Sequence, residues 1–282
     1  ARPGSDLHTA RHVARMLGTQ HHETLIGGEL FALTWERLVS EGGHPLCTPN
    51  EVAIALLADA VSPHAKAALT GEGADELFGG YGAPLEATLG WIDATPAHDA
   101  ASAADFYRTA FGWAPRVLVP ELFGRDAIAR FGATDDDPLA DLLVDACRDA
   151  GDLSTIDAHL AVQRRVNLVH LLERLNLSLM RGSVEGRVPF ADVRVLDTAL
   201  RAGGAHLFNE GEGGVATTTG TMVTKRVLRR AFADVLPPGA IVTQRVPNAQ
   251  LASGPGIGSL SGPAGAMLAV SNGLLTIAQN LN

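Results

Sequence analysis

The segment Thr70–Tyr81 has the densest group of side chains that could carry chemistry, in the order TGEGADELFGGY. Glycines at Gly71 and Gly73 would let backbone N–H groups approach a ligand closely. Three carboxylates lie among them: Glu72, Asp75 and Glu76. Carboxylate oxygens bind Mg²⁺ well when phosphate oxygens complete its coordination, so one interpretation is a nucleotide site. The other is an acidic turn at the start of a helix, where negative charge is favourable.

A second candidate is the charged pair Glu185 and Arg187, which lies among apolar residues in Ser183–Asp192, SVEGRVPFAD. An arginine guanidinium can bind carboxylate or phosphate through two parallel hydrogen bonds. Glu185 could orient that guanidinium or take a proton. The alternative is a buried ion pair that holds two helices in register, and these residues alone favour it.

A basic run, Thr224–Arg230, could direct a cation such as Lys225 at a phosphate, although a charge run on a helix is usually a solvated face. Two other candidates are weaker. His21 and His22 are neighbours on an expected strand, so their rings should point to opposite faces and not share a metal. Cys47 has no nearby partner in sequence, so we expect a small buried thiol.

Composition limits the classes of function. The chain has 282 residues, of which 46% are hydrophobic and 19% charged, and its mean hydropathy is +0.12. These values indicate a globular protein with a sizeable core. A formal charge of −9 argues against a nucleic-acid partner. Two cysteines predict no disulfide scaffold and a cytoplasmic location, and no apolar run approaches the ~20 residues that span a bilayer.

The elements before Thr70 alternate between helix and strand. We predict, in order, a helix over 6–17, a strand over 20–26, a helix over 49–61 and a strand over 65–69. Ser5 could cap the first helix and Gly18 end it, and Thr48–Glu51 has the spacing of a capping box. This order predicts an α/β core with a parallel sheet.

Helical spacing dominates the second half of the chain. We predict three helices there: 153–180, 193–201 and 222–235. Ser154 and Asp157 could cap the first of them, and Asp192 the second. Residues 251–282 are rich in Gly, Ser, Ala and Pro and have no charged or aromatic side chain, so we expect a loose tail after a domain over 1–250.

Several motifs resemble one family. Thr70–Tyr81 resembles the synthetase-domain signature of the glutamine-dependent asparagine synthetases, which is SGEGSDE, a large apolar residue and FGGY. Ser183–Asp192 is similar to the family's E-x-R-V-P-F-L-D block, and Thr224–Pro237 to its K-x-x-L-R helix ending in Leu-Pro. Two shorter matches lie upstream: Pro3–Asp6 and Leu17–Glu23. The resemblance covers residues 1–245.

This resemblance implies a partial adenine-nucleotide α-hydrolase-like fold, with ATP at the C-terminal ends of parallel strands. It also implies a reaction that uses Mg²⁺. In that family aspartate attacks the α-phosphate of ATP to give β-aspartyl adenylate and pyrophosphate. Ammonia derived from glutamine then displaces AMP and gives asparagine. The resemblance also allows a homodimer.

Residue roles follow position by position from the resemblance. It implies these nucleotide-binding residues: Thr70, Gly71, Glu72 and Gly73. It implies these catalytic residues: Glu72, Asp75, Glu185, Arg187 and Lys225. Thr70 and Gly71 would contact the adenylate, and Glu72 would lie beside the reacting acyl group and handle the ammonia proton. Asp75 would hold Mg²⁺ and pyrophosphate, Lys225 would contact phosphate, and the pair at 185 and 187 would support the site.

The sequence departs from the family in three places. The pyrophosphate loop S-G-G-x-D-S is absent, so we expect it upstream of Ala1 together with the adenine-binding strand. The N-terminal glutaminase domain is also absent, so another domain or free ammonia must supply nitrogen. Finally, Pro247 follows Arg245-Val246 where the family has a lysine. A neutral residue there would lower turnover more than binding, because the lost contact belongs to the transition state.

Two alternatives to an asparagine synthetase follow. One is a related amide synthetase of secondary metabolism, of the β-lactam synthetase or lasso-peptide cyclase type. The β-lactam enzymes have tyrosine at the position of Glu72, so Glu72 favours the asparagine interpretation. The other alternative is a non-catalytic fragment, which the absent loop and Pro247 favour.

Overall fold

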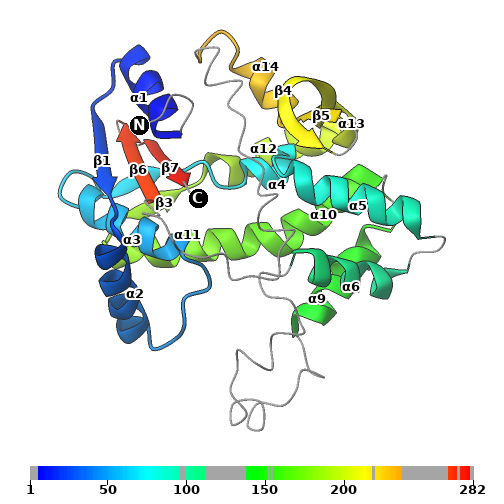
Figure 1. The fold of residues 1–282 in the computed structure, drawn as a ribbon, viewed down its shortest axis with the longest axis horizontal. Helices are drawn as coiled ribbons and strands as arrows, with labels where there is room; N and C mark the ends of the chain where they lie inside the picture. The colour runs from blue at the N-terminus through cyan, green and yellow to red at the C-terminus, as the bar shows by residue number, and fades with distance from the viewer. Residues whose placement is uncertain are drawn as a thin grey trace.

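A five-stranded sheet forms one side of the molecule and a group of helices the other (Figure 1). The computed structural model describes residues 6–95, 99–111, 138–151, 153, 155–217, 220–236, 266–271 and 274–279. The strand order is β1-β6-β7-β2-β3. The strands are β1 (His21–Leu25), β2 (Ala67–Leu69), β3 (Glu185–Arg187), β6 (Ala266–Ser271) and β7 (Leu274–Gln279). β2 is parallel to β3 and β7, whereas β6 is antiparallel to β1 and β7.

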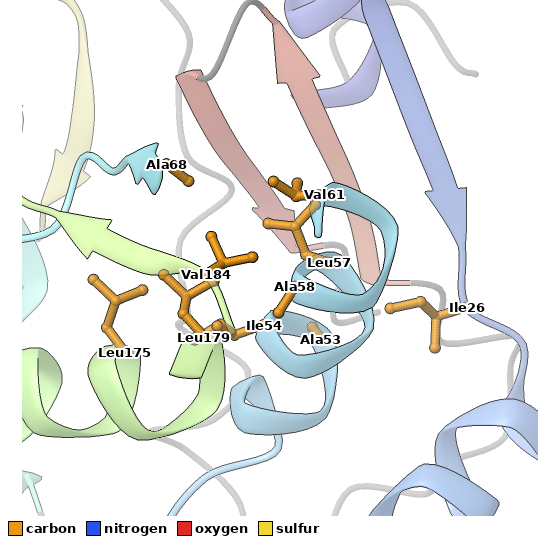
Figure 2. Packing of buried hydrophobic residues seen from close by; sticks show 10 residues of the cluster. All are labelled: Ile26, Ala53, Ile54, Leu57, Ala58, Val61, Ala68, Leu175, Leu179 and Val184. Carbon is orange, nitrogen blue, oxygen red and sulfur yellow. The ribbon is translucent and has the colours of Figure 1, made fainter. Parts of the chain in front are cut away.

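Two helices pack their apolar side chains toward this sheet: α3 (Asn50–Val61) and α11 (Val169–Arg181). Figure 2 shows the resulting core between them and the strands. Its buried members include Ile54 and Leu57 of α3 and Leu175 and Leu179 of α11, each at most 1% exposed. Burial of aliphatic side chains on this scale is the main force that holds helices to a sheet, at roughly 1.5–3 kcal/mol for each side chain. This core fixes the end of β2, from which the candidate loop begins.

The four elements predicted before Thr70 are all present, but α2 (Gly28–Gly42), between β1 and α3, was not predicted, and the sheet is mixed rather than wholly parallel because β1 pairs antiparallel with β6. α1 spans Asp6–Met16 and ends at Gly18, whose φ of +65° is the left-handed conformation typical of a helix end. α2 packs on α3 through a small second core that includes Leu38. Glu51 accepts hydrogen bonds from the backbone N–H groups of Cys47 and Thr48, so one half of the predicted capping box forms. Ser5 lies outside the described residues.

The long helix predicted over 153–180 is present as three consecutive pieces. α10 (Thr155–Gln163) leads through a π-helical turn, Arg164–Leu168, into α11. Three other helices pack beside α10 and the π-helical turn: α5 (Gly82–Ala94), α6 (Ala100–Phe111) and α9 (Pro138–Asp149). Asp157, predicted as a cap, instead accepts a hydrogen bond from the backbone N–H of Gly204 at 2.6 Å. Ser154 lies outside the described residues.

Short elements complete the described chain. They are α4 (Ala74–Phe78), a 3₁₀ turn (Pro189–Ala191), α12 (Val193–Ala202), α13 (Gly204–Leu207), β4 (Asn209–Thr217), β5 (Gly220–Val223) and α14 (Arg226–Ala231). Asp192 accepts a hydrogen bond from the N–H of Arg194 at the start of α12, which confirms the predicted cap. Among the described helices none has both the length and the apolar character needed to cross a bilayer.

Three predictions about local structure need correction or comment. The helix predicted over 222–235 is wrong: β5 occupies its start, and the helix begins only at Arg226 because Lys225 has a left-handed φ of +53°. Cys47 is exposed rather than buried. The predicted tail includes β6 and β7, which pair in the sheet between β1 and β2, while residues 251–265 lie outside the described chain.

Candidate active site at the end of β2

The glycine-rich loop begins where β2 ends. Thr70 donates its backbone N–H to the carbonyl of Arg187 at 2.8 Å, so the loop starts beside the C-terminal end of the parallel strand β3. Gly73 then turns the chain with a φ of +87°, a conformation that a side chain disfavours, and α4 follows. Thr70 Oγ1 is buried and has no hydrogen-bond partner among the described residues. The loop therefore has a polar group available for a ligand at its first residue.

Asp75 and Lys225 meet at this loop. Lys225 Nζ lies 2.9 Å from Asp75 Oδ1, and the two side chains are 25% and 14% exposed. Gly80 makes room for them, because a Cβ at that position would overlap both Asp75 Oδ1 and Lys225 Cε. The fold thus joins two residues that the sequence placed in separate motifs, and it supports a site that handles charge.

Glu72 is paired with a residue that the sequence motifs did not single out. Arg174 of α11 donates from Nη2 to Glu72 Oε1 at 2.9 Å. It also lies 3.4 Å from Thr48 Oγ1, just before α3. Helical periodicity gave no signal for it, because Arg174 does not lie on the apolar side that Leu175 and Leu179 define.

Glu76 serves a different purpose from the other carboxylates in the loop. It is 1% exposed and accepts a hydrogen bond from Tyr81 Oη at 2.7 Å. Burial raises the pKa of the Glu76 carboxyl group, with a smaller contribution from the neighbouring charges of Asp75 and Glu72. A carboxyl group buried in this way stabilises the turn and is unsuited to hold an exposed metal ion.

Glu185 and Arg187 belong to β3 rather than to a helix end, and they point away from the core. Their side chains are 60% and 62% exposed and pair with each other at 3.2 Å, so the expectation of a buried ion pair between helices is wrong. The reason is that Gly186 between them faces Leu179 of α11 and turns its neighbours outward. Arg187 borders an open pocket of about 460 Å³. Leu172, Asn176 and Asp192 also line it.

The remaining candidates divide as expected. His21 pairs with Glu23, with 2.8 Å between Nε2 and Oε1, whereas the ring of His22 stacks on that of His64. The two neighbouring imidazoles therefore have separate partners. In the basic run, Lys225 is the residue that reaches the acidic loop.

Sequence comparison gives the family of the chain. The sequence model of the asparagine synthase family matches residues 1–248. The chain belongs to the asparagine synthase family. A relative from Bacillus subtilis (strain 168), asparagine synthetase [glutamine-hydrolyzing] 1, is 34% identical over 77 residues. That alignment spans 27% of this chain and 12% of the relative. No solved structure matches the chain significantly.

The described residues offer limited ligands for the Mg²⁺ that the asparagine synthase family suggests. They contain no group of three or more His, Cys, Asp or Glu side chains that could hold a metal ion. Asp75 is already paired with Lys225, and Glu72 with Arg174. One carboxylate can hold Mg²⁺ when phosphate oxygens and water fill its other positions, so these residues could bind the ion only together with a nucleotide.

Proposed function

We propose that this chain is the synthetase part of an ATP-dependent amide-forming ligase, with aspartate as the carboxylate substrate. The observation that carries the proposal is the placement of two ion pairs, Glu72–Arg174 and Asp75–Lys225, beside the glycine loop at the end of β2. In open α/β sheets ligands bind at this end of the strands. Membership of the asparagine synthase family supports the same class of reaction.

The reaction has two steps. In the first, an oxygen of the aspartate β-carboxylate forms a bond to the α-phosphorus of ATP, and the bond to the β-phosphate oxygen breaks, releasing pyrophosphate. In the second, the nitrogen of ammonia attacks the acyl carbon, the acyl C–O bond breaks and AMP leaves. The attacking nitrogen must lose a proton in this second step. Positioning and charge stabilisation account for most of the catalysis in such transfers.

Each residue has a role in this proposal. Thr70 and Gly71 contact the adenylate, since among the described residues Thr70 Oγ1 has no partner and no atom lies within 4 Å of a Cβ built on Gly71. Lys225 stabilises negative charge on the departing pyrophosphate. Asp75 orients Lys225 and would be the protein ligand of Mg²⁺, which neutralises phosphate charge when bound. Glu72 receives the ammonia proton.

The other assignments stay proposals of the same kind. Glu185 and Arg187 support the site from β3, and Gly73 shapes the loop. We propose an adenine-nucleotide α-hydrolase-like fold for residues 1–250, completed by a pyrophosphate loop outside this chain. We also propose that a separate glutaminase domain supplies nitrogen, in a cytoplasmic protein. A non-catalytic role is the second candidate, and Pro247 in place of the expected lysine favours it.

Pyrophosphate–ATP exchange tests the proposal, because it reports the first step alone. The full-length protein should exchange label in the presence of aspartate, and Asp75→Asn should lower the rate by about 100-fold without unfolding the protein. Asp197→Asn is the matched control, because Asp197 is exposed on α12 and its ion pair within the described structure is with Arg201, one turn away. Absence of exchange in the wild-type protein with any carboxylate would instead support the non-catalytic role.

A further inference from the structure

Arg174 is a buried cation directly behind the glycine loop. Its side chain is 6% exposed, and it reaches from α11 to Glu72, whose side chain is 19% exposed. An arginine cannot lose its charge in a protein, so burying it costs free energy unless a partner compensates. The pair with Glu72 is that compensation, and it couples the long helix to the loop.

The contact leaves one oxygen of Glu72 available. Arg174 Nη2 donates to Oε1 at 2.9 Å, and no described residue donates a hydrogen bond to Oε2. A two-pronged pair would engage both oxygens, as Arg194 does with Asp192. The geometry at Glu72 therefore restrains the carboxylate without using all of its acceptor capacity.

The other donors of Arg174 are poorly used. Nη1 lies 3.4 Å from Thr48 Oγ1, a long contact, and Nε is buried without a hydrogen-bond partner in the part of the chain that the structure describes. A buried arginine that served only to join elements would be expected to satisfy more of its five donors. Its one short contact within the described structure is to the loop carboxylate.

We propose that Arg174 is a positioning residue, which holds Oε1 of Glu72 so that Oε2 faces the amine that is to be deprotonated. This rests on the proposed function and concerns the second step only. A free glutamate side chain samples several rotamers, and a general base works only within hydrogen-bond reach of its proton. Misplacement by about 1 Å can cost about 100-fold in rate.

Comparison of the two half-reactions in the full-length protein tests this. Arg174→Met should lower kcat for amide formation from ammonia by about 100-fold. It should leave pyrophosphate exchange and KM for ATP within about threefold of wild type, because adenylation does not use Glu72 as a base. Arg174→Lys keeps the positive charge and can still donate a hydrogen bond to Glu72, so kcat for amide formation should be about tenfold higher than in Arg174→Met.

Arg181→Met is the matched control, because Arg181 is on the same helix and pairs with Glu41 at 3.5 Å. It should leave both half-reactions unchanged. Equal losses in exchange and amide formation, or no loss, for Arg174→Met would overturn the positioning role while leaving the proposed function intact. If Arg174→Met does not fold, Arg174→Lys tests the proposal in the same way: amide formation should fall while pyrophosphate exchange should not. Absence of exchange in the wild-type protein would overturn both proposals.

Discussion

Lys225 Nζ lies 2.9 Å from Asp75 Oδ1, and this ion pair joins the start of α14 to the glycine loop. The backbone of Lys225 has a left-handed φ of +53°, which is uncommon for a residue with a long side chain. Such strain is found mainly where surrounding structure maintains it, often at functional sites. The strained backbone of Lys225 therefore supports the proposal that this lysine and Asp75 act together in the site.

Gly80→Ala should disrupt this ion pair from the opposite side. The added methyl group would overlap Asp75 Oδ1 and Lys225 Cε, so both side chains must move. We expect pyrophosphate exchange to fall by at least about tenfold and the free energy of unfolding to drop by about 1–2 kcal/mol. Rates from isotope exchange and denaturant titrations measure the two effects.

Gly90→Ala is the control for that substitution. Gly90 is exposed within α5, and no atom of the described residues lies within 4 Å of a Cβ built on it. The change should leave exchange intact and stabilise the protein by about 0.5–1 kcal/mol, since alanine favours a helix. Similar activities of the two variants would show that the Asp75–Lys225 pair has no part in adenylation.

Gly71→Ala should separate function from stability. No described atom lies within 4 Å of a Cβ built on Gly71, and its φ is not in the left-handed region, so the fold has room for a methyl group. The free energy of unfolding should change by less than about 0.5 kcal/mol. If the adenylate lies over this residue, KM for ATP in the exchange reaction should rise by about tenfold or more. An unchanged KM for ATP would show that the nucleotide does not bind over Gly71.

Local patterns predicted α1, β1, α3 and β2 because helices with short-range start and stop signals can be found from sequence, but they missed α2. Gly18 and the Thr48–Glu51 box are examples, and both mark observed helix ends. The wrong predictions concern segments whose structure depends on pairing with strands elsewhere in the chain. Glu185 and Arg187 lie on a strand because β3 pairs with β2, which neither residue's neighbours reveal. Likewise β5 exists through its pairing with β4, so the predicted helix began too early.

The candidate site could be predicted only in part, because its ion pairs also join residues that are distant in sequence. The motifs identified Glu72, Asp75 and Lys225 but not which cation each carboxylate would meet. The partner of Glu72, Arg174, comes from the middle of a helix, where it is buried although its spacing does not match the predicted apolar positions. A pairing between residues this far apart in sequence depends on how α11 packs against α3 and β3, which no local pattern contains.

Stability should fall in mild acid because of His159. This side chain is 2% exposed, and its Nδ1 lies 2.9 Å from Thr88 Oγ1 and 3.1 Å from Tyr107 Oη. Burial lowers the pKa of His159 to about 4 from 6.5. Between these two values the unfolded chain binds a proton that the folded chain does not, so the free energy of unfolding decreases as pH falls.

Protonation of His159 should lower the free energy of unfolding by about 3 kcal/mol between pH 6.5 and pH 4. Urea titrations across that range would measure this change. His159→Gln removes the titrating group, so the free energy of unfolding should depend less on pH. The substitution also lowers stability at neutral pH because it disturbs a packed site. The matched control is His64→Gln, since His64 is exposed, and this variant should keep the wild-type dependence of stability on pH.

The ring of His159 packs against Tyr107 of α6 and contacts Thr88 of α5, so its protonation should open the helical side of the molecule first. Hydrogen exchange at pH 4.5 would then show faster opening in α5 and α6 than in α3, and equal protection of all three helices would contradict this assignment.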